Sequence, residues 1–155
     1  SSHCTTGRSA PEPHKNMIGI DTNVLVRYLT QDDAAQAARA TRFMEAELGP
    51  AQQGCISVVV LVELCWVLQS LYRVTPSELL DLIDDLLRSR HLQLEHRPAV
   101  QAAVHALRQS PKASAGLADV LITHIGQALG CSHTASFDKG AVRWAGMTLP
   151  DLDAP

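Results

Sequence analysis

Short apolar segments alternate with longer segments of helical period along most of this chain, and this alternation is the feature that most constrains its fold. The strand-like segments are residues 18–20, 54–57, 92–94, 133–137 and 147–149. Strands that alternate with helices favour a parallel sheet covered on both faces. We therefore predict an α/β fold, specifically a three-layer α/β/α sandwich around a central parallel sheet.

The helical segments carry clear start and stop signals. Thr75, Pro76 and Glu78 form a capping box with proline in the first turn, which predicts a helix start there. Thr22 or Asn23 is expected to cap the helix that follows the first strand. Residues 58–71 are apolar almost all round, so we expect that helix to be central and buried.

Composition indicates one compact domain at residues 17–150. The chain has 155 residues, of which 46% are hydrophobic and 19% are charged, enough for a sizeable core. Residues 1–16 are rich in Ser, Thr, Pro and Gly and lack an apolar core, so we interpret them as a disordered leader, natural or added in cloning, and neither signal peptide nor anchor. No later run predicts a membrane span, and four cysteines without CxxC spacing fit a reducing cytoplasm.

Charge and aromatic content limit the function classes. The net charge is −3 and aromatics are 4%, so neither a global basic field nor a base-stacking platform indicates nucleic acid. A nucleic-acid partner would depend on local arginines and lysines or on bound cations. Seven scattered histidines without paired cysteines argue against zinc. The missing phosphate-binding glycine motifs argue against dinucleotide and P-loop enzymes.

Four acids are notable for where they fall. Asp21 ends the first strand, and Asp138 follows the strand at residues 133–137. Glu63 is the only charge in residues 55–68, and a lone buried carboxylate needs a partner or a metal. Asp119 lies near the start of a helix. Each also has an ordinary explanation: Asp21 and Asp138 as helix caps, Asp119 as a complement to the helix dipole, and Glu63 in an ion pair with an arginine such as Arg27 or Arg73.

Together the four acids indicate more than each does alone. The carboxyl ends of parallel strands meet at one edge of a sheet, so the acids are expected to converge there. Like charges about 4 Å apart repel by roughly 4 kcal/mol at an effective dielectric constant near 20. Divalent cations would offset that repulsion. Ligation by oxygen alone favours Mg²⁺ or Mn²⁺.

At these acids the chain resembles PIN-domain ribonucleases, and in particular the VapC toxins of bacterial toxin–antitoxin pairs. The four motifs that carry the resemblance are IDTNVL at residues 20–25, SVVVLVEL at 57–64, ADVLI at 118–122 and SFDK at 136–139. The resemblance covers residues 17–149, and the motifs occur in the family's order.

The resemblance implies a metal-dependent endoribonuclease that leaves 5′-phosphate and 3′-hydroxyl ends. The acids that match its metal-holding, catalytic positions are Asp21, Glu63, Asp119 and Asp138. The polar residues that match its supporting positions are Thr22, Asn23 and Ser136. Arg27, Lys139 and Arg143 are the basic residues nearest to these acids in the sequence, and they are candidates for gathering RNA phosphates.

The resemblance also implies partners: an RNA substrate, a cognate antitoxin and a second copy in a homodimer. Apolar positions in residues 58–72, including Trp66 and Tyr72, suit such an interface, although core packing explains them equally well. Gly116 departs from the family, which often has an acid there, so one or two metals remain open. The alternative function is a catalytically silent module that binds RNA or a protein partner.

Overall fold

The computed structural model describes residues 16–110 and 116–150. Nearly all of the expected leader lies outside these residues, so its assignment stays a prediction. Three short strands form a parallel sheet in the order β1-β2-β3. They are β1 (Ile18–Gly19), β2 (Gly54–Ile56) and β3 (Leu92–Leu94). The register pairs Gly19 with Cys55, and Cys55 with Gln93.

Seven α-helices and one π-helical turn make up most of the described chain. They are α1 (Thr22–Thr30), α2 (Ala34–Arg42), η1 (Phe43–Glu47), α3 (Val58–Leu71), α4 (Pro76–Arg88), α5 (Arg97–Gln109), α6 (Leu117–Ala128) and α7 (Lys139–Trp144). The capping box at the start of α4 is confirmed: Thr75 Oγ1 accepts from the Glu78 amide, and the Glu78 carboxylate accepts from the Thr75 amide. In the described parts of the chain, no helix is both long and apolar enough to cross a membrane.

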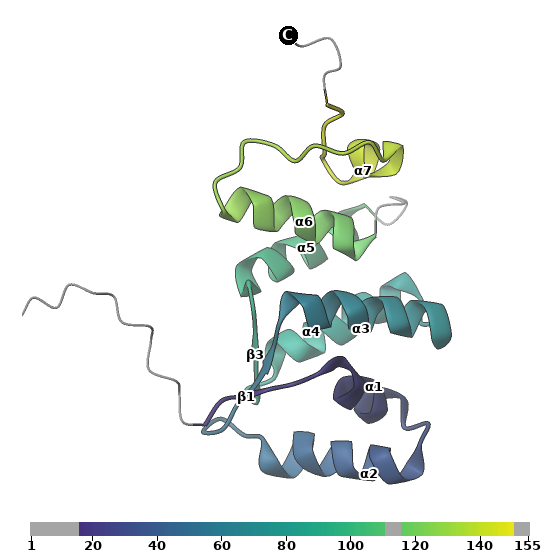
Figure 1. Cartoon of the computed structure of the whole chain (residues 1–155), viewed down its shortest axis with the longest axis vertical. Coiled ribbons are helices and arrows are strands. Elements are labelled where there is room, and N and C mark those ends of the chain that lie inside the picture. The colour runs from purple at the N-terminus through teal and green to yellow at the C-terminus, as the bar shows by residue number, and fades with distance from the viewer. Residues whose placement is uncertain (1–15, 111–115, 151–155) are drawn as a thin grey trace, which may run out of the picture.

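The helices are stacked along the long axis of the molecule, with the strands at one side of the stack (Figure 1). α1 and α2 lie at one end, α3 and α4 in the middle, and α5, α6 and α7 towards the other end. The expected α/β fold with a parallel sheet is confirmed. This order matters for function because α7, which follows Asp138, lies at the opposite end from α1, which follows Asp21.

Side chains on the two faces of the sheet differ in burial. The row made by Ile20, Ile56 and Leu94 is buried in the main core. Gly54 is needed on that face, because a Cβ there would lie 2.4 Å from Ile20 Cδ1. On the other face Gln93 is exposed, as is Gly19. The sheet therefore buries one face and presents polar and small residues on the other.

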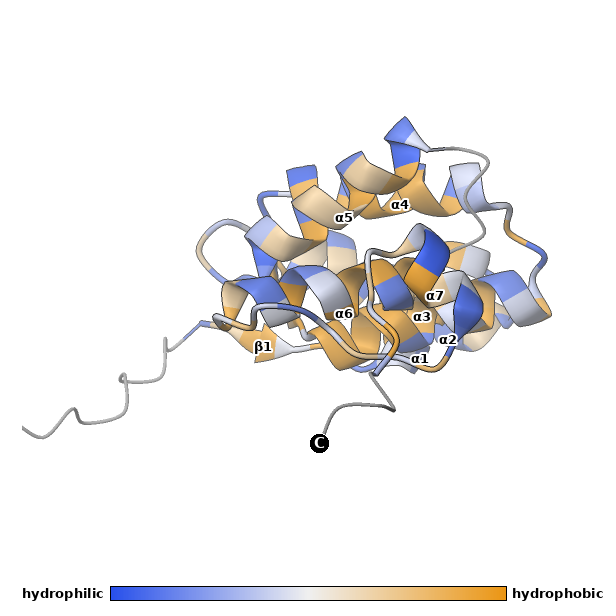
Figure 2. Ribbon diagram, turned by 90° about the horizontal axis from the view of Figure 1, so that it is seen from above, coloured by the Kyte–Doolittle hydropathy of each residue, from blue (hydrophilic) through white to orange (hydrophobic). Residues whose placement is uncertain are grey.

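Two expectations about individual elements were wrong. The helix at residues 58–71 is predominantly apolar (Figure 2), but it is not buried all round, since Val59 is 77% exposed and Trp66 is 63% exposed. The segments at residues 133–137 and 147–149 form only an isolated parallel bridge, between Ala135 and Thr148. That bridge holds the two segments to each other, and no described residue of β1, β2 or β3 pairs with them.

Candidate functional site

The carboxyl ends of the three strands open into a hollow of about 700 Å³, which we call the strand-end hollow. Asp21 lies at its β1 side and Ser57 at its β2 side, each directly after the strand. Glu95 follows β3 in the same way. The parallel order of the strands thus places three polar residues at one edge of the sheet, as expected for an open α/β sheet.

Glu95 is a member of this hollow that the sequence reasoning missed. Its Oε1 atom accepts a hydrogen bond from the Val58 amide at 2.9 Å, so it satisfies an otherwise open donor in the first turn of α3. The Ser57 hydroxyl accepts from the Val60 amide at 3.2 Å in the same turn. The signal was present in the sequence, because Glu95 directly follows the segment at residues 92–94 as Asp21 follows the first strand.

Asp21, and not Thr22 or Asn23, caps α1. The Asp21 carboxylate accepts from the Thr22 amide at 2.9 Å while the Asp21 side chain remains exposed to solvent. Thr22 is the first helical residue and is 6% exposed. Its Oγ1 atom is buried and has no hydrogen-bond partner among the described residues. A buried hydroxyl without a hydrogen-bond partner destabilises the folded state. Its position beside Asp21 therefore makes Thr22 a candidate for a functional role.

Glu63 does not need the partner that a buried charge would need. It lies on the exposed side of α3, one turn after Val59 and one turn before Trp66, both of which are also exposed. The alternative explanation of Glu63, an ion pair with Arg27 or Arg73, is wrong, because none of the ion pairs in the described chain includes Glu63. Its carboxylate is therefore hydrated and open to a ligand from solvent.

The other two acids stand at helix starts. Asp119 lies half-buried in the first turn of α6, where it complements the helix dipole. Asp138 caps α7, and its Oδ1 atom accepts from the Gly140 amide at 2.8 Å. Ser136 supports this turn directly, because its Oγ atom accepts from the Asp138 amide at 3.0 Å. Three of the four motif acids thus perform the ordinary structural roles considered for them.

The structure does not bring the four motif acids together into one cluster. In residues 16–110 and 116–150, no three His, Cys, Asp or Glu side chains gather closely enough to hold a metal ion. The donor set has the oxygen chemistry that Mg²⁺ or Mn²⁺ prefers, but this arrangement does not form a metal centre.

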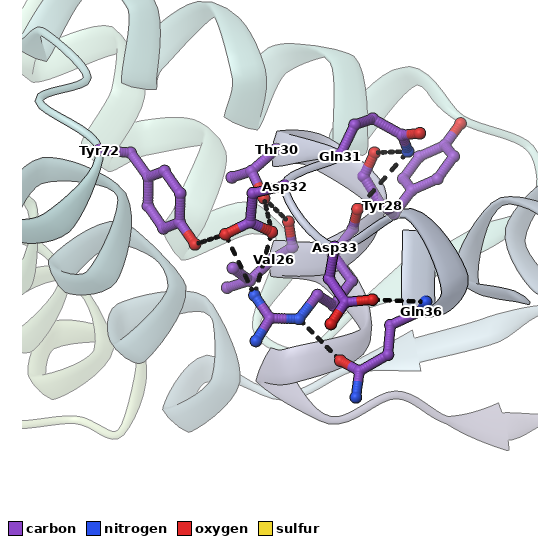
Figure 3. Close-up of polar contacts among 9 residues, drawn as sticks. Val26, Tyr28, Thr30, Gln31, Asp32, Asp33, Gln36 and Tyr72 are labelled. Carbon is purple, nitrogen blue, oxygen red and sulfur yellow. Dashed lines mark hydrogen bonds and ion pairs between the residues drawn. The ribbon is translucent and has the colours of Figure 1, made fainter. Parts of the chain in front are cut away.

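Arg27 is committed to an internal network. Its guanidinium pairs with Asp32 at 3.1 Å and donates from Nε to Gln36 at 2.7 Å. Tyr72, just after α3, donates its hydroxyl to the same Asp32 carboxylate, and Thr30 donates to it at 3.0 Å (Figure 3). The hydrogen bonds from Tyr72 and Thr30 are the main cause that lowers the pKa of Asp32, with the nearby Arg27 charge adding to it. Arg27 is therefore less available to RNA than its sequence position implied.

Comparison with known proteins defines the class first. This α/β chain, with a parallel sheet and an aspartate at the carboxyl end of its first strand, matches the family model of the PIN domain over residues 18–146. This match covers most of the sequence, and the chain belongs to the PIN domain family. PIN domains are commonly nucleases. Comparison with curated proteins gives no match.

Proposed function

We propose that this protein is a divalent-metal-dependent endoribonuclease. The observation that carries the proposal is the PIN match over residues 18–146, combined with the position of Asp21 at the strand-end hollow. An exposed carboxylate at the carboxyl end of a β-strand is well placed to meet a ligand from solvent. The other exposed motif acids, Glu63 and Asp138, make no ion pair with any described residue.

Mg²⁺ or Mn²⁺ is the cofactor that we propose, with Asp21, Glu63, Asp119 and Asp138 as its oxygen ligands. Such an ion, if held by these acids, would supply Lewis-acid activation of water and would offset charge on a phosphodiester. Because these acids are apart in the structure described here, the proposal requires them to approach each other when the ion and RNA bind. Binding would then stabilise the folded state by mass action, so magnesium is expected to raise the melting temperature.

Asp21→Asn is the sharpest test, because the chain contains a matched control. Asp21 caps α1 and Asp33 caps α2, and the carboxylate of Asp33 accepts from the Gln36 amide at 3.0 Å. Asparagine caps helices as well as aspartate does, so either substitution leaves the cap intact. Purified wild-type protein, Asp21→Asn and Asp33→Asn are each incubated with total cellular RNA and Mg²⁺ or Mn²⁺, with EDTA as a further control.

The expected result is discrete cleavage by wild-type protein and by Asp33→Asn. The cleavage rate of Asp21→Asn should be at least about 100-fold below that of wild type. This factor of about 100 is the upper end of what is lost when a metal ligand loses its hydrogen-bond partner. EDTA should abolish the cuts. Cleavage that survives in Asp21→Asn would refute the proposed site. Equal loss in both variants would mean that removing a negative charge at a helix start, and not the chemistry at Asp21, lowers the activity.

We further propose that the nuclease is the cytoplasmic toxin of a toxin–antitoxin pair and that it forms a homodimer. The support is the resemblance of its four motifs to VapC toxins, together with the exposed apolar side chains of Val59 and Trp66 on α3. Tyr72 does not belong to such a surface, because its hydroxyl is engaged with Asp32. Growth arrest on expression, relieved by a co-expressed neighbouring small protein, is the expected outcome, and harmless expression of the active nuclease would refute the toxin role.

A catalytically silent PIN module remains the second candidate, and one observation favours it. The separation of the motif acids in the described chain is what a silent module would show. Protein that binds RNA without cutting it, and whose melting temperature magnesium does not change, would establish this candidate over the enzyme.

A further inference from the structure

A second hollow, of about 670 Å³, lies between α1, α2 and β1. Three arginines line it, and we call it the arginine groove. They are Arg27 from α1, and Arg39 and Arg42 from the last turn of α2. This is a local basic site in a chain whose net charge is −3, and such a site attracts phosphates where the global field does not.

Two of these arginines are available to a ligand. Arg39 and Arg42 are exposed, and neither pairs with an acid within 4.0 Å in the described chain, whereas Arg27 pairs with Asp32. Among the described residues that line the groove, Glu47 is the one acid, so a single negative charge is set against the two available arginines. The local balance is therefore positive.

Another hollow lined by arginines lies between α4 and α5, and one of its arginines is paired with acids. Arg108 there is held at 2.7 Å by both Asp81 and Asp84. Arg97 is also engaged, because it donates to the Leu87 carbonyl. Arg88 also lines that hollow and has no acid within 4.0 Å in the described chain, so its removal serves as the comparison for removing Arg39 and Arg42.

The arginine groove adjoins the strand-end hollow at β1. Gly19 and Ile20 line both, so the two hollows meet at β1, and Asn23 of the first motif lines the arginine groove. Nothing lies within 4 Å of the position that a Gly19 Cβ would occupy, so no described side chain covers β1 at Gly19. A chain lying across β1 would reach Asp21 on one side and the arginines on the other.

The lining also has an apolar part. Val24 and Phe43, both partly buried against the core, line the groove together with its charged residues. Positive charge beside an apolar and aromatic wall is the combination that single-stranded nucleic acids bind, through phosphates on the charged side and unpaired bases on the apolar side. Double-stranded RNA offers no unstacked base to such a wall.

From this adjacency, the unpaired arginines and the apolar lining, we infer that the arginine groove binds the backbone of single-stranded RNA beside the strand-end hollow, with Arg39 and Arg42 as its phosphate contacts. The inference rests on the proposed nuclease function, because it identifies the RNA passing Asp21 as the ligand. Arg39 and Arg42 act as positioning residues: they hold the strand and take no part in breaking it.

The test measures RNA binding separately from cleavage. Fluorescence anisotropy follows a labelled single-stranded RNA of about 12 nucleotides, a length that OB-fold-sized sites accommodate, in EDTA at several salt concentrations. The variant is Arg39→Gln/Arg42→Gln. The matched control is Arg88→Gln/Arg90→Gln, which removes the same charge, and Arg88 also lies in the last turn of its helix. Arg39→Lys/Arg42→Lys retains both charges.

The groove variant should bind RNA roughly 5- to 30-fold more weakly than wild type, the effect of losing two exposed ionic contacts. Its slope of log K against log salt should be shallower by about 1.4, because each phosphate contact with a single strand contributes about 0.7. The control pair and the lysine variant should stay near wild type. With cleavable RNA, the groove variant should raise KM and leave kcat unchanged, as expected when uniform binding is lost.

Each alternative outcome separates the two proposals. Equal weakening in the groove and control variants, or no binding by wild type in EDTA, overturns the groove, while cleavage by wild type would still uphold the nuclease. If RNA binding is weakened only in the groove variant, and wild-type protein cleaves no RNA, the nuclease proposal is overturned and the groove is an RNA-binding site of a silent module. A lower kcat with an unchanged KM would assign the arginines to chemistry and overturn their positioning role.

Discussion

Thr22 offers a test in which stability and activity should move in opposite directions. Its hydroxyl oxygen is buried and lacks a partner among the described residues, while the whole residue is 6% exposed. Replacing Thr22 by Val preserves the branched shape and removes the oxygen. Since a buried polar group without a partner costs about 1–3 kcal/mol, Thr22→Val should increase the free energy of unfolding by about 1–2 kcal/mol.

For a chain of this size, that increase corresponds to a rise in melting temperature of about 3–8 °C. The assay is urea unfolding at pH 7 followed by circular dichroism, with unchanged denaturant slope as evidence that only stability changed. Thr22→Ser is the control, because it retains the hydroxyl and loses the methyl group. That loss should destabilise by about 0.5–1.5 kcal/mol, as for other single buried methyl deletions.

Cleavage activity provides the second readout. If the Thr22 hydroxyl serves the site beside Asp21, Thr22→Val should be more stable than wild type and should cleave RNA more slowly. Stability and activity often change in opposite directions when a functional polar group is removed. A destabilised Thr22→Val would refute the reasoning, because it would mean that the hydroxyl makes a favourable hydrogen bond in the folded protein. A stabilised and fully active variant would remove Thr22 from the site.

Two further predictions follow from pKa shifts. Because hydrogen bonds lower the pKa of Asp32 below its unfolded value, its stabilisation is present above about pH 4 and is lost as pH falls through the folded pKa. Tyr72→Phe should therefore lower stability in urea at pH 7, and its difference from wild type should shrink towards pH 2. Burial raises the pKa of the Cys65 thiol to about 12, so Cys65 should resist a thiol reagent at pH 8 while the exposed Cys131 reacts; equal rates would refute burial of Cys65.

The parts of the fold that sequence predicted correctly are those with strong local signals. The start of α4 is fixed by a capping box that involves only Thr75 and Glu78. The first three strands are short apolar runs that end at polar residues, and the register of β2 and β3 buries alternate residues as predicted for a sheet face. Local chemistry decides such features, so one sequence is enough to identify them.

The errors arose where long-range contacts decide. The apolar content of residues 58–71 indicated a buried helix, but hydropathy does not reveal which side a helix leaves open, and Glu63 and Trp66 share that open side of α3. The Phe137 region has strand propensity, but a strand needs a partner. In that region Ala135 pairs with Thr148 in an isolated bridge. A single bridge is too short to add a strand to the sheet.

The placement of the acids shows why motif order alone does not establish a site. Asp21 and Asp138 each satisfy backbone amides at a helix start, and both caps would form wherever the following helix happened to lie. A cap is local, whereas a metal centre needs several elements to be brought together. Glu95 illustrates the converse: the parallel order of β1, β2 and β3 brings it to the same hollow as Asp21, although no motif includes it. Glu95→Gln should preserve the Val58 contact through its amide oxygen and, by removing a charge from the hollow where we propose that RNA is cut, should lower kcat/KM for cleavage. An unchanged kcat/KM would show that Glu95 serves only the first turn of α3.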